Sequence, residues 1–230
     1  SAIFLLNSCC QDDDVATEKQ GKVNIYIEGD LTNAEAQAQL EEEYGYQTEN
    51  IYVQETTQLT SLIITLKYKL RSIIFKDSNI NLSEIKIHGK EKINELKIEN
   101  SNNDSNILID GFISADKILI KTQNNNNTNK LTNIVCNDLK QVNHFISLFA
   151  SYSRDNSVLF SDLEIAGKFN SSVYWNNWSG KFIEFNFPLL EEVYNLNMTY
   201  NYDNYYDISG FGIIKNSLTF PKLKKINYLY

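Results

Sequence analysis

The sequence predicts a mainly β solenoid, in which short parallel strands stack on one another along a common axis. Tyr and Phe dominate the aromatic residues, which make up 12% of the 230 residues, and such residues favour strands. Short apolar ladders recur along the chain with turn-forming residues between them. Near the C-terminus a ten-residue pattern occurs twice, with its first residues at Phe187 and Phe220. Recurring ladders of this kind are typical of solenoids.

The first elements are expected to be a strand, a helix and a second strand, which together form a small N-terminal cap over residues 22–58. Val23, Ile25 and Ile27 alternate with polar residues, as in a half-buried strand. The second strand is expected at 51–53, where apolar residues again flank a tyrosine.

The helix between these strands is expected over 33–44. Thr32 and Glu35 have the spacing of a capping box, and Gly45 lies where a helix commonly stops. Three residues at helical spacing are expected to face inward: Ala36, Leu40 and Tyr44. The three carboxylates at 41–43 are then a solvated face.

From residue 59 to 230 the chain is expected to form the repeat solenoid. The repeated pattern is one apolar residue, two variable residues, a second apolar residue, one variable residue and a third apolar residue. It occurs at 70–75, 82–87, 93–98 and 131–136. One coil cannot bury its own apolar side, so successive coils are expected to stack and share a continuous core.

The clearest repeat is the pair of segments 187–196 and 220–229. Both prolines of the chain, Pro188 and Pro221, occupy the same place in the two copies, where proline would fix the turn before a strand. The pair Glu191-Glu192 in the first copy is replaced by Lys224-Lys225 in the second. If the copies are stacked, these residues form a surface salt-bridge ladder, worth about 0 to 1 kcal/mol per pair.

The apolar spacing and the Phe-Pro-x-Leu segments resemble leucine-rich repeats over residues 60–230, in particular the irregular surface repeats of Bacteroidetes lipoproteins and receptor L-domains. The resemblance implies a leucine-rich-repeat-like solenoid. The usual Asn after the ladder is not regularly present, so an irregular parallel β-helix is the alternative. Because Tyr230 follows a repeat strand without a polar terminal cap, we expect the natural chain to continue.

The N-terminus carries a short apolar run, 2–6, which we interpret as the end of a secretory signal peptide, so that 1–8 is its remnant. Residues 6–9 resemble a bacterial lipobox, which implies that Cys9 is lipidated and that 9–21 is a flexible tether. The acidic run 12–14 resembles the surface-export signal of Bacteroidetes lipoproteins. This implies a lipid-anchored protein at the bacterial outer membrane or cell surface; an ordinary cleaved signal is the alternative.

The sequence contains no His-Glu-x-x-His, Gly-x-Ser-x-Gly or P-loop motif, so we expect no catalytic residue, metal or cofactor. The net charge of -8 argues against nucleic-acid binding. We expect His88 to be exposed in a turn, His144 to be half-buried and Cys136 to be a small buried apolar residue. A Ca²⁺ site at Asp203 and Asp207 matches no known loop.

The candidate ligand contacts are aromatic residues close to Asn and Asp: Tyr174, Trp175, Trp178, Tyr202 and Tyr205. Aromatic rings pack on the apolar faces of sugars and also anchor protein interfaces, while amides and carboxylates bond hydroxyls. The alternative is that these rings belong to the core. We therefore expect a non-enzymatic cell-surface lipoprotein that binds or adheres to extracellular protein or glycan ligands. The other functions considered are a β-helical polysaccharide lyase or hydrolase and a structural spacer.

Overall fold

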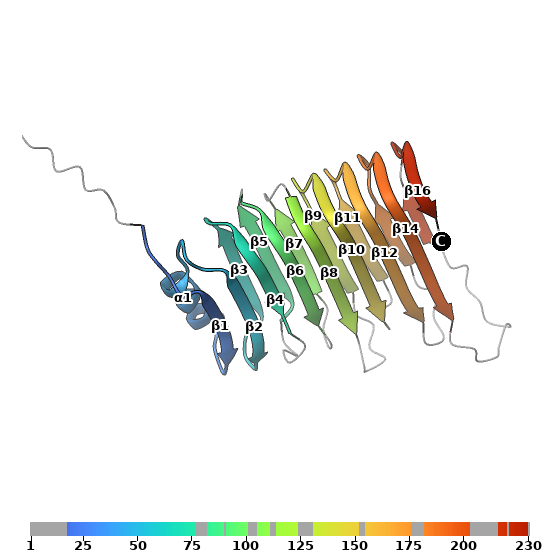
Figure 1. Cartoon of the computed structure of the whole chain (residues 1–230). Helices are drawn as coiled ribbons and strands as arrows, with labels where there is room; N and C mark the ends of the chain where they lie inside the picture. Colours follow the sequence, from blue (N-terminus) through green and yellow to red (C-terminus); the bar gives the residue numbers. More distant parts are fainter. Residues whose placement is uncertain are drawn as a thin grey trace, which may run out of the picture.

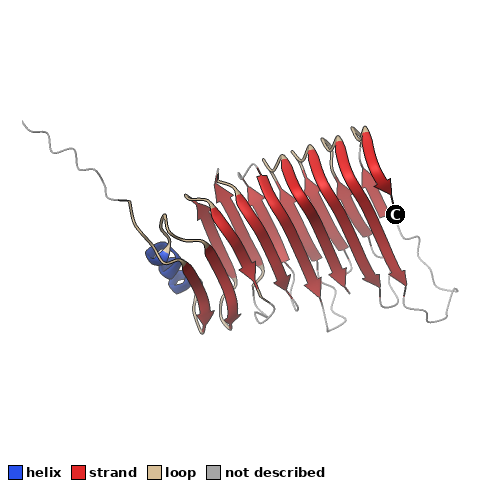
Figure 2. Ribbon diagram, viewed as in Figure 1, coloured by secondary structure: helices blue, strands red, loops and turns tan. Residues whose placement is uncertain are grey.

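The computed structural model describes residues 18–76, 82–89, 91–100, 105–110, 114–123, 131–151, 155–175, 182–202, 216–219 and 221–229. These residues form two facing sheets and one helix, arranged as an elongated solenoid with the helix at the N-terminal end (Figures 1 and 2). The nine-stranded sheet contains, in order, β1 (Asn24–Gly29), β2 (Asn50–Thr56), β4 (Leu70–Phe75), β6 (Ile93–Asn100), β8 (Ser114–Gln123), β10 (Gln141–Ser151), β12 (Ile165–Trp175), β14 (Glu192–Tyr202) and β16 (Lys225–Leu229). The seven-stranded sheet contains β3 (Ser61–Leu66), β5 (Glu84–Gly89), β7 (Ser105–Asp110), β9 (Leu131–Cys136), β11 (Asp155–Phe160), β13 (Phe182–Asn186) and β15 (Asn216–Thr219).

From β2 onward, successive strands alternate between the two sheets, and neighbouring strands within each sheet are parallel. Each coil therefore contributes one strand to each sheet, and the two facing sheets form the two walls of the solenoid. The predicted solenoid of stacked short parallel strands is confirmed. Its described coils have two walls, which differs both from the single curved sheet of a horseshoe and from a three-sided coil.

The strand register explains the apolar ladders of the sequence. Leu70 pairs with Ile93 and Phe75 pairs with Ile98 on the neighbouring strand, so the segments 70–75 and 93–98 lie one full coil apart. The segment 82–87 falls between them in sequence but lies in the opposite sheet. A ladder that recurs every 11 or 12 residues thus marks half a coil.

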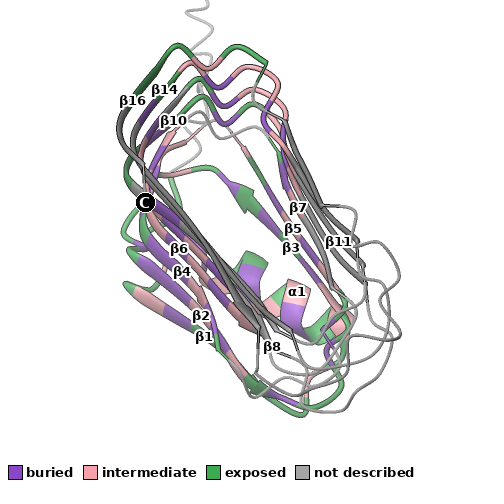
Figure 3. Ribbon diagram, turned by 90° about the vertical axis from the view of Figure 1, so that its right-hand side faces the viewer, coloured by how far each residue is buried: buried purple, intermediate pink, exposed green. Residues whose placement is uncertain are grey.

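Buried residues lie along both sheets (Figure 3). The core lies between the two walls, where inward-facing side chains form continuous columns. One column runs through the nine-stranded sheet in register and is fully buried: Ile25, Ile51, Ile73, Leu96, Ile118 and Ile146. Burying an aliphatic side chain of this size contributes about 1.5–3 kcal/mol. Each strand thus shares its buried face with the strands above and below it.

The repeated Phe-Pro segments form the turns between the walls. Pro188 and Pro221 both lie in turns shortly before β14 and β16, as predicted. The Phe187 ring is buried and stacks on the Phe160 ring of the preceding coil, with centroids 5.2 Å apart. The register of β11 with β13 also aligns Leu159 with Asn186, so Phe160 and Phe187 occupy equivalent places in successive coils.

The predicted salt-bridge ladder between these copies is confirmed. Glu192 is the register partner of Lys225. The Lys224 ammonium lies 2.9 Å from the Glu191 carboxylate, and the Lys225 ammonium lies 3.7 Å from the Glu192 carboxylate.

The N-terminal cap has the expected order of β1, α1 (Asn33–Glu43) and β2. The capping box is present, since the Glu35 backbone N–H donates to the Thr32 hydroxyl while the Thr32 N–H donates to the Glu35 carboxylate. The three residues expected to face inward are buried: Ala36, Leu40 and Tyr44.

Two details of the cap differ from the prediction. Val23 is 48% exposed because it precedes β1, at a corner where its carbonyl accepts the N–H groups of Glu49 and Asn50. Gly45 does not end the helix in a left-handed conformation. It is required for close packing, because a Cβ at this position would lie 2.3 Å from the Lys19 carbonyl oxygen.

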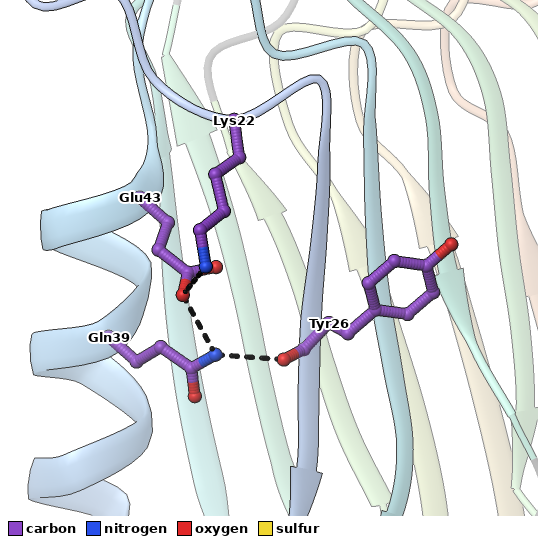
Figure 4. Close-up of polar contacts among 4 residues, drawn as sticks. All are labelled: Lys22, Tyr26, Gln39 and Glu43. Atoms are coloured by element: carbon purple, nitrogen blue, oxygen red, sulfur yellow. Dashed lines mark hydrogen bonds and ion pairs between the residues drawn. The ribbon is translucent and has the colours of Figure 1, made fainter.

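Helix α1 covers strand edges at the N-terminal end of the solenoid. The Asn33 side-chain oxygen accepts the backbone N–H groups of Thr60 (2.7 Å) and Ser61 (3.1 Å), where β3 begins. Gln39 donates to the Tyr26 carbonyl of β1 at 2.9 Å and to Glu43, which also pairs with Lys22 (Figure 4). Exposed edges invite pairing with other chains, and these side chains occupy part of both edges.

The predicted signal-peptide remnant and Cys9 lie outside the described residues. Within the described part of the chain, no helix has the length and apolar character needed to cross a membrane.

Candidate ligand-binding surface

Three of the predicted aromatic contacts lie in strands toward the other end of the solenoid from α1. Trp175 and Tyr202 are register partners at the ends of the neighbouring strands β12 and β14, and Tyr174 pairs with Asn201. The fold therefore brings together aromatic positions that are 27 residues apart in the sequence (175 to 202). Trp178 and Tyr205 lie outside the described residues.

A second aromatic position lies at the N-terminal end and was not singled out from the sequence. Tyr26 of β1 and Tyr52 of β2 are register partners, and their rings stack with centroids 5.0 Å apart and planes 10° from parallel. Tyr26 is 45% exposed. The signal was present in the sequence, since each tyrosine is flanked by apolar residues in the matching segments 25–27 and 51–53.

Polar side chains of β1 also contact side chains of β2, through hydrogen bonds. The Asn50 amide donates to the Asn24 side-chain oxygen at 2.8 Å, and the Ser72 hydroxyl donates to the Asn50 side-chain oxygen at 2.7 Å. On the other side of the tyrosines, the Gln54 amide donates to the Glu28 carboxylate at 3.0 Å. Three outward-facing side chains of β1 are therefore each held by a side chain of β2.

A polar network joins three coils of the nine-stranded sheet. The Asp116 carboxylate accepts the Asn143 amide at 2.7 Å and pairs with the Lys92 ammonium at 2.9 Å. These hydrogen bonds hold the pKa of Asp116 below its usual range. Asp116 therefore stays ionised over the physiological pH range, and its contacts join neighbouring coils.

The two histidines are both exposed. His144 was expected to be half-buried, but β10 has a register shift between Val142 and Phe145 that places its side chain outside. His88 is exposed as predicted, although it lies within β5, where its Nε2 is 2.9 Å from the Thr65 hydroxyl.

Cys136 is buried in the core, as predicted, and burial raises the pKa of its thiol. A thiol that stays protonated is a poor nucleophile. The candidate calcium ligands Asp203 and Asp207 lie outside the described residues.

Within the described ranges, no group of three or more His, Cys, Asp or Glu side chains is arranged to hold a metal ion. No family model, curated protein or solved structure matches the chain.

Proposed function

We propose that the protein is a non-enzymatic binding or adhesion module at the bacterial cell surface, attached to the outer membrane through a lipid on Cys9. Its partners would be extracellular proteins or glycans. The observation that carries the proposal is the outer face of the nine-stranded sheet, where the aromatic residues Tyr26 and Tyr52 stack between polar side chains. Trp and Tyr rings are common anchors of binding surfaces.

The scaffold supports this proposal because its outward side chains stand on paired strands with a buried core beneath them. Stacked coils present extended surfaces suited to long ligands. Side chains held in place before binding lose less conformational entropy on binding.

A binding screen tests the proposed activity. The full chain with Cys9→Ser would be screened against a glycan array and extracellular matrix proteins, beside Trp175→Ala and Trp178→Ala variants whose melting temperatures match the parent. Saturable binding by the parent supports the proposal, and loss of binding in the tryptophan variants places contacts at the C-terminal aromatic positions. Absence of any binding refutes the binding function, and cleavage of an acidic polysaccharide refutes the non-enzymatic one.

The anchor needs its own experiment. Cells that express the secreted protein would be fed an alkyne-tagged fatty acid, and the tag would be detected on the purified chain. We expect labelling of the parent and none of Cys9→Ser. Equal labelling of both proteins, or labelling of neither, refutes attachment through Cys9.

A further inference from the structure

We propose that the outer face of β1 is a sugar-binding platform for a neutral glycan, in which one pyranose ring packs on Tyr26 and its hydroxyls bond Asn24 and Glu28. The proposal rests on the binding function proposed above and names its ligand class. The three residues alternate along one strand, so they share one face of the sheet.

Among the residues that the structure describes, Tyr52 stacks on one face of the Tyr26 ring and the side chain stays largely exposed. The stack is nearly parallel, with the ring centroids 5.0 Å apart. In the described part of the chain β1 is the end strand of its sheet, and Tyr26 is 45% exposed. Its backbone carbonyl is held by Gln39 while the ring points away from α1 (Figure 4). A flat, exposed, fixed ring is what the apolar face of a pyranose requires.

The flanking groups have the chemistry and the spacing to bond hydroxyls. Residues two apart on a strand are about 6.6 Å apart, so Asn24 and Glu28 lie on either side of a sugar centred over Tyr26. Glu28 accepts one hydrogen bond from Gln54 through Oε2 and has a second carboxylate oxygen, Oε1. Asn24 accepts from Asn50 through its oxygen and has an amide NH₂ that can donate.

The second strand holds each of these groups in place. Asn24 is held by Asn50, and Asn50 is held by the buried Ser72. Tyr26 is backed by Tyr52. This organisation of all three side chains before binding favours affinity, because little rotamer freedom remains to be lost.

The charge of the platform selects the class of glycan. Glu28 is its one carboxylate, and Asn24, Tyr26 and Tyr52 are uncharged. The whole chain has a net charge of -8. An anionic sugar would be repelled, whereas a neutral sugar with hydroxyl donors matches the Glu28 oxygen. We therefore expect neutral hexose oligosaccharides to bind and uronate or sulfated glycans to bind more weakly.

The test is a titration of the full chain carrying Cys9→Ser with immobilised neutral gluco-, manno- and galacto-oligosaccharides, and with oligogalacturonate for comparison. Tyr26→Ala is expected to weaken binding at least tenfold. Asn24→Ala and Glu28→Gln are each expected to weaken it two- to tenfold, as for the loss of one hydrogen bond. The matched control is Tyr46→Ala, which removes another tyrosine of the cap that is 48% exposed. It should bind like the parent, and all variants should melt within a few degrees of it.

The outcomes separate this inference from the proposed function. Loss of neutral-glycan binding in Tyr26→Ala but not in Tyr46→Ala supports the platform. Neutral-glycan binding that survives Tyr26→Ala overturns the platform and leaves the binding function standing. Binding only to matrix proteins or to oligogalacturonate also overturns the platform and leaves the binding function standing. A parent that binds no ligand of either screen overturns both.

Discussion

Replacing Asn33 by alanine is expected to destabilise the N-terminal end of the solenoid by about 1–2 kcal/mol. The substitution removes three hydrogen bonds: Asn33 accepts the N–H groups of Thr60 and Ser61 and donates to the Thr60 hydroxyl at 2.8 Å. Hydrogen bonds contribute about 0.5–1.5 kcal/mol each, and the low end applies because Thr60 is exposed and Ser61 is half-buried. The higher helix propensity of alanine offsets about 0.5 kcal/mol of this loss in unfolding free energy.

The assay combines urea unfolding with backbone amide exchange. Because each coil contacts chiefly its neighbours, the loss is expected to be local, with exchange at Thr60 and Ser61 accelerated by about five- to thirtyfold and β11 unchanged. Asn33→Asp keeps the acceptor and should recover most of the stability. Glu42→Ala, at an exposed position of the same helix, is the control for changes in propensity. If Asn33→Ala unfolds like Glu42→Ala, the side-chain cap on the β3 edge contributes nothing and the reasoning is wrong.

Four further outcomes are expected. Gly167→Ala should cost about 1–3 kcal/mol in thermal unfolding, because the added Cβ would lie 2.3 Å from the carbonyl oxygen of Asn143. Cys136 should resist iodoacetamide in the folded protein and react in guanidinium, as peptide mapping would show; rapid labelling in the folded state would contradict its burial. Lys224→Ala should change the unfolding free energy by less than about 1 kcal/mol, and by less still in 1 M salt, because its pair is exposed. The hydrogen bonds from Thr32 lower the pKa of Glu35, so the stability they provide is present above the ordinary pKa of the carboxyl and is lost as the pH falls through the lowered value. Urea midpoints at pH 6 and pH 3 should therefore differ more for the parent than for Glu35→Gln.

Features set by neighbouring residues could be predicted from the sequence. The capping box needs only Thr32 and Glu35 at the right spacing, and the structure contains it. The salt-bridge ladder was also predictable, because the two Phe-Pro copies align Glu191 with Lys224 and an in-register solenoid places aligned residues side by side.

The number of walls was not predictable from the same residues. Strands of either sheet carry the same pattern of inward-facing apolar residues. The pattern at 70–75 and 82–87 therefore does not indicate that these two segments lie on opposite sides of the core. The exposure of His144 depends on a register shift relative to β8 and β12, which no local pattern in β10 reveals.

The stacked pair of Tyr26 and Tyr52 shows the same limit of prediction from the sequence. Tyr26 and Tyr52 are ordinary outward strand residues when each strand is considered alone. They become a stacked pair only when β1 and β2 are placed in register. The C-terminal aromatic residues could be identified from the sequence because they are clustered along the chain, whereas Tyr26 and Tyr52 are close together only in the folded structure.

Regular stacking also fixes distance along the axis of the molecule. Parallel strands repeat about every 4.8 Å, so the six intervals from β1 to β12 place β12 roughly 29 Å along the axis from Tyr26. If a glycan binds at Tyr26 as proposed, a disaccharide would be too short to extend to the outer face of β12, whereas a polysaccharide chain could extend that far and gain avidity from a second contact. Deleting one coil would shorten this interval by about 4.8 Å. Under the proposed binding function, the fold would therefore make the length of a ligand, as well as its chemistry, a determinant of how tightly it is held.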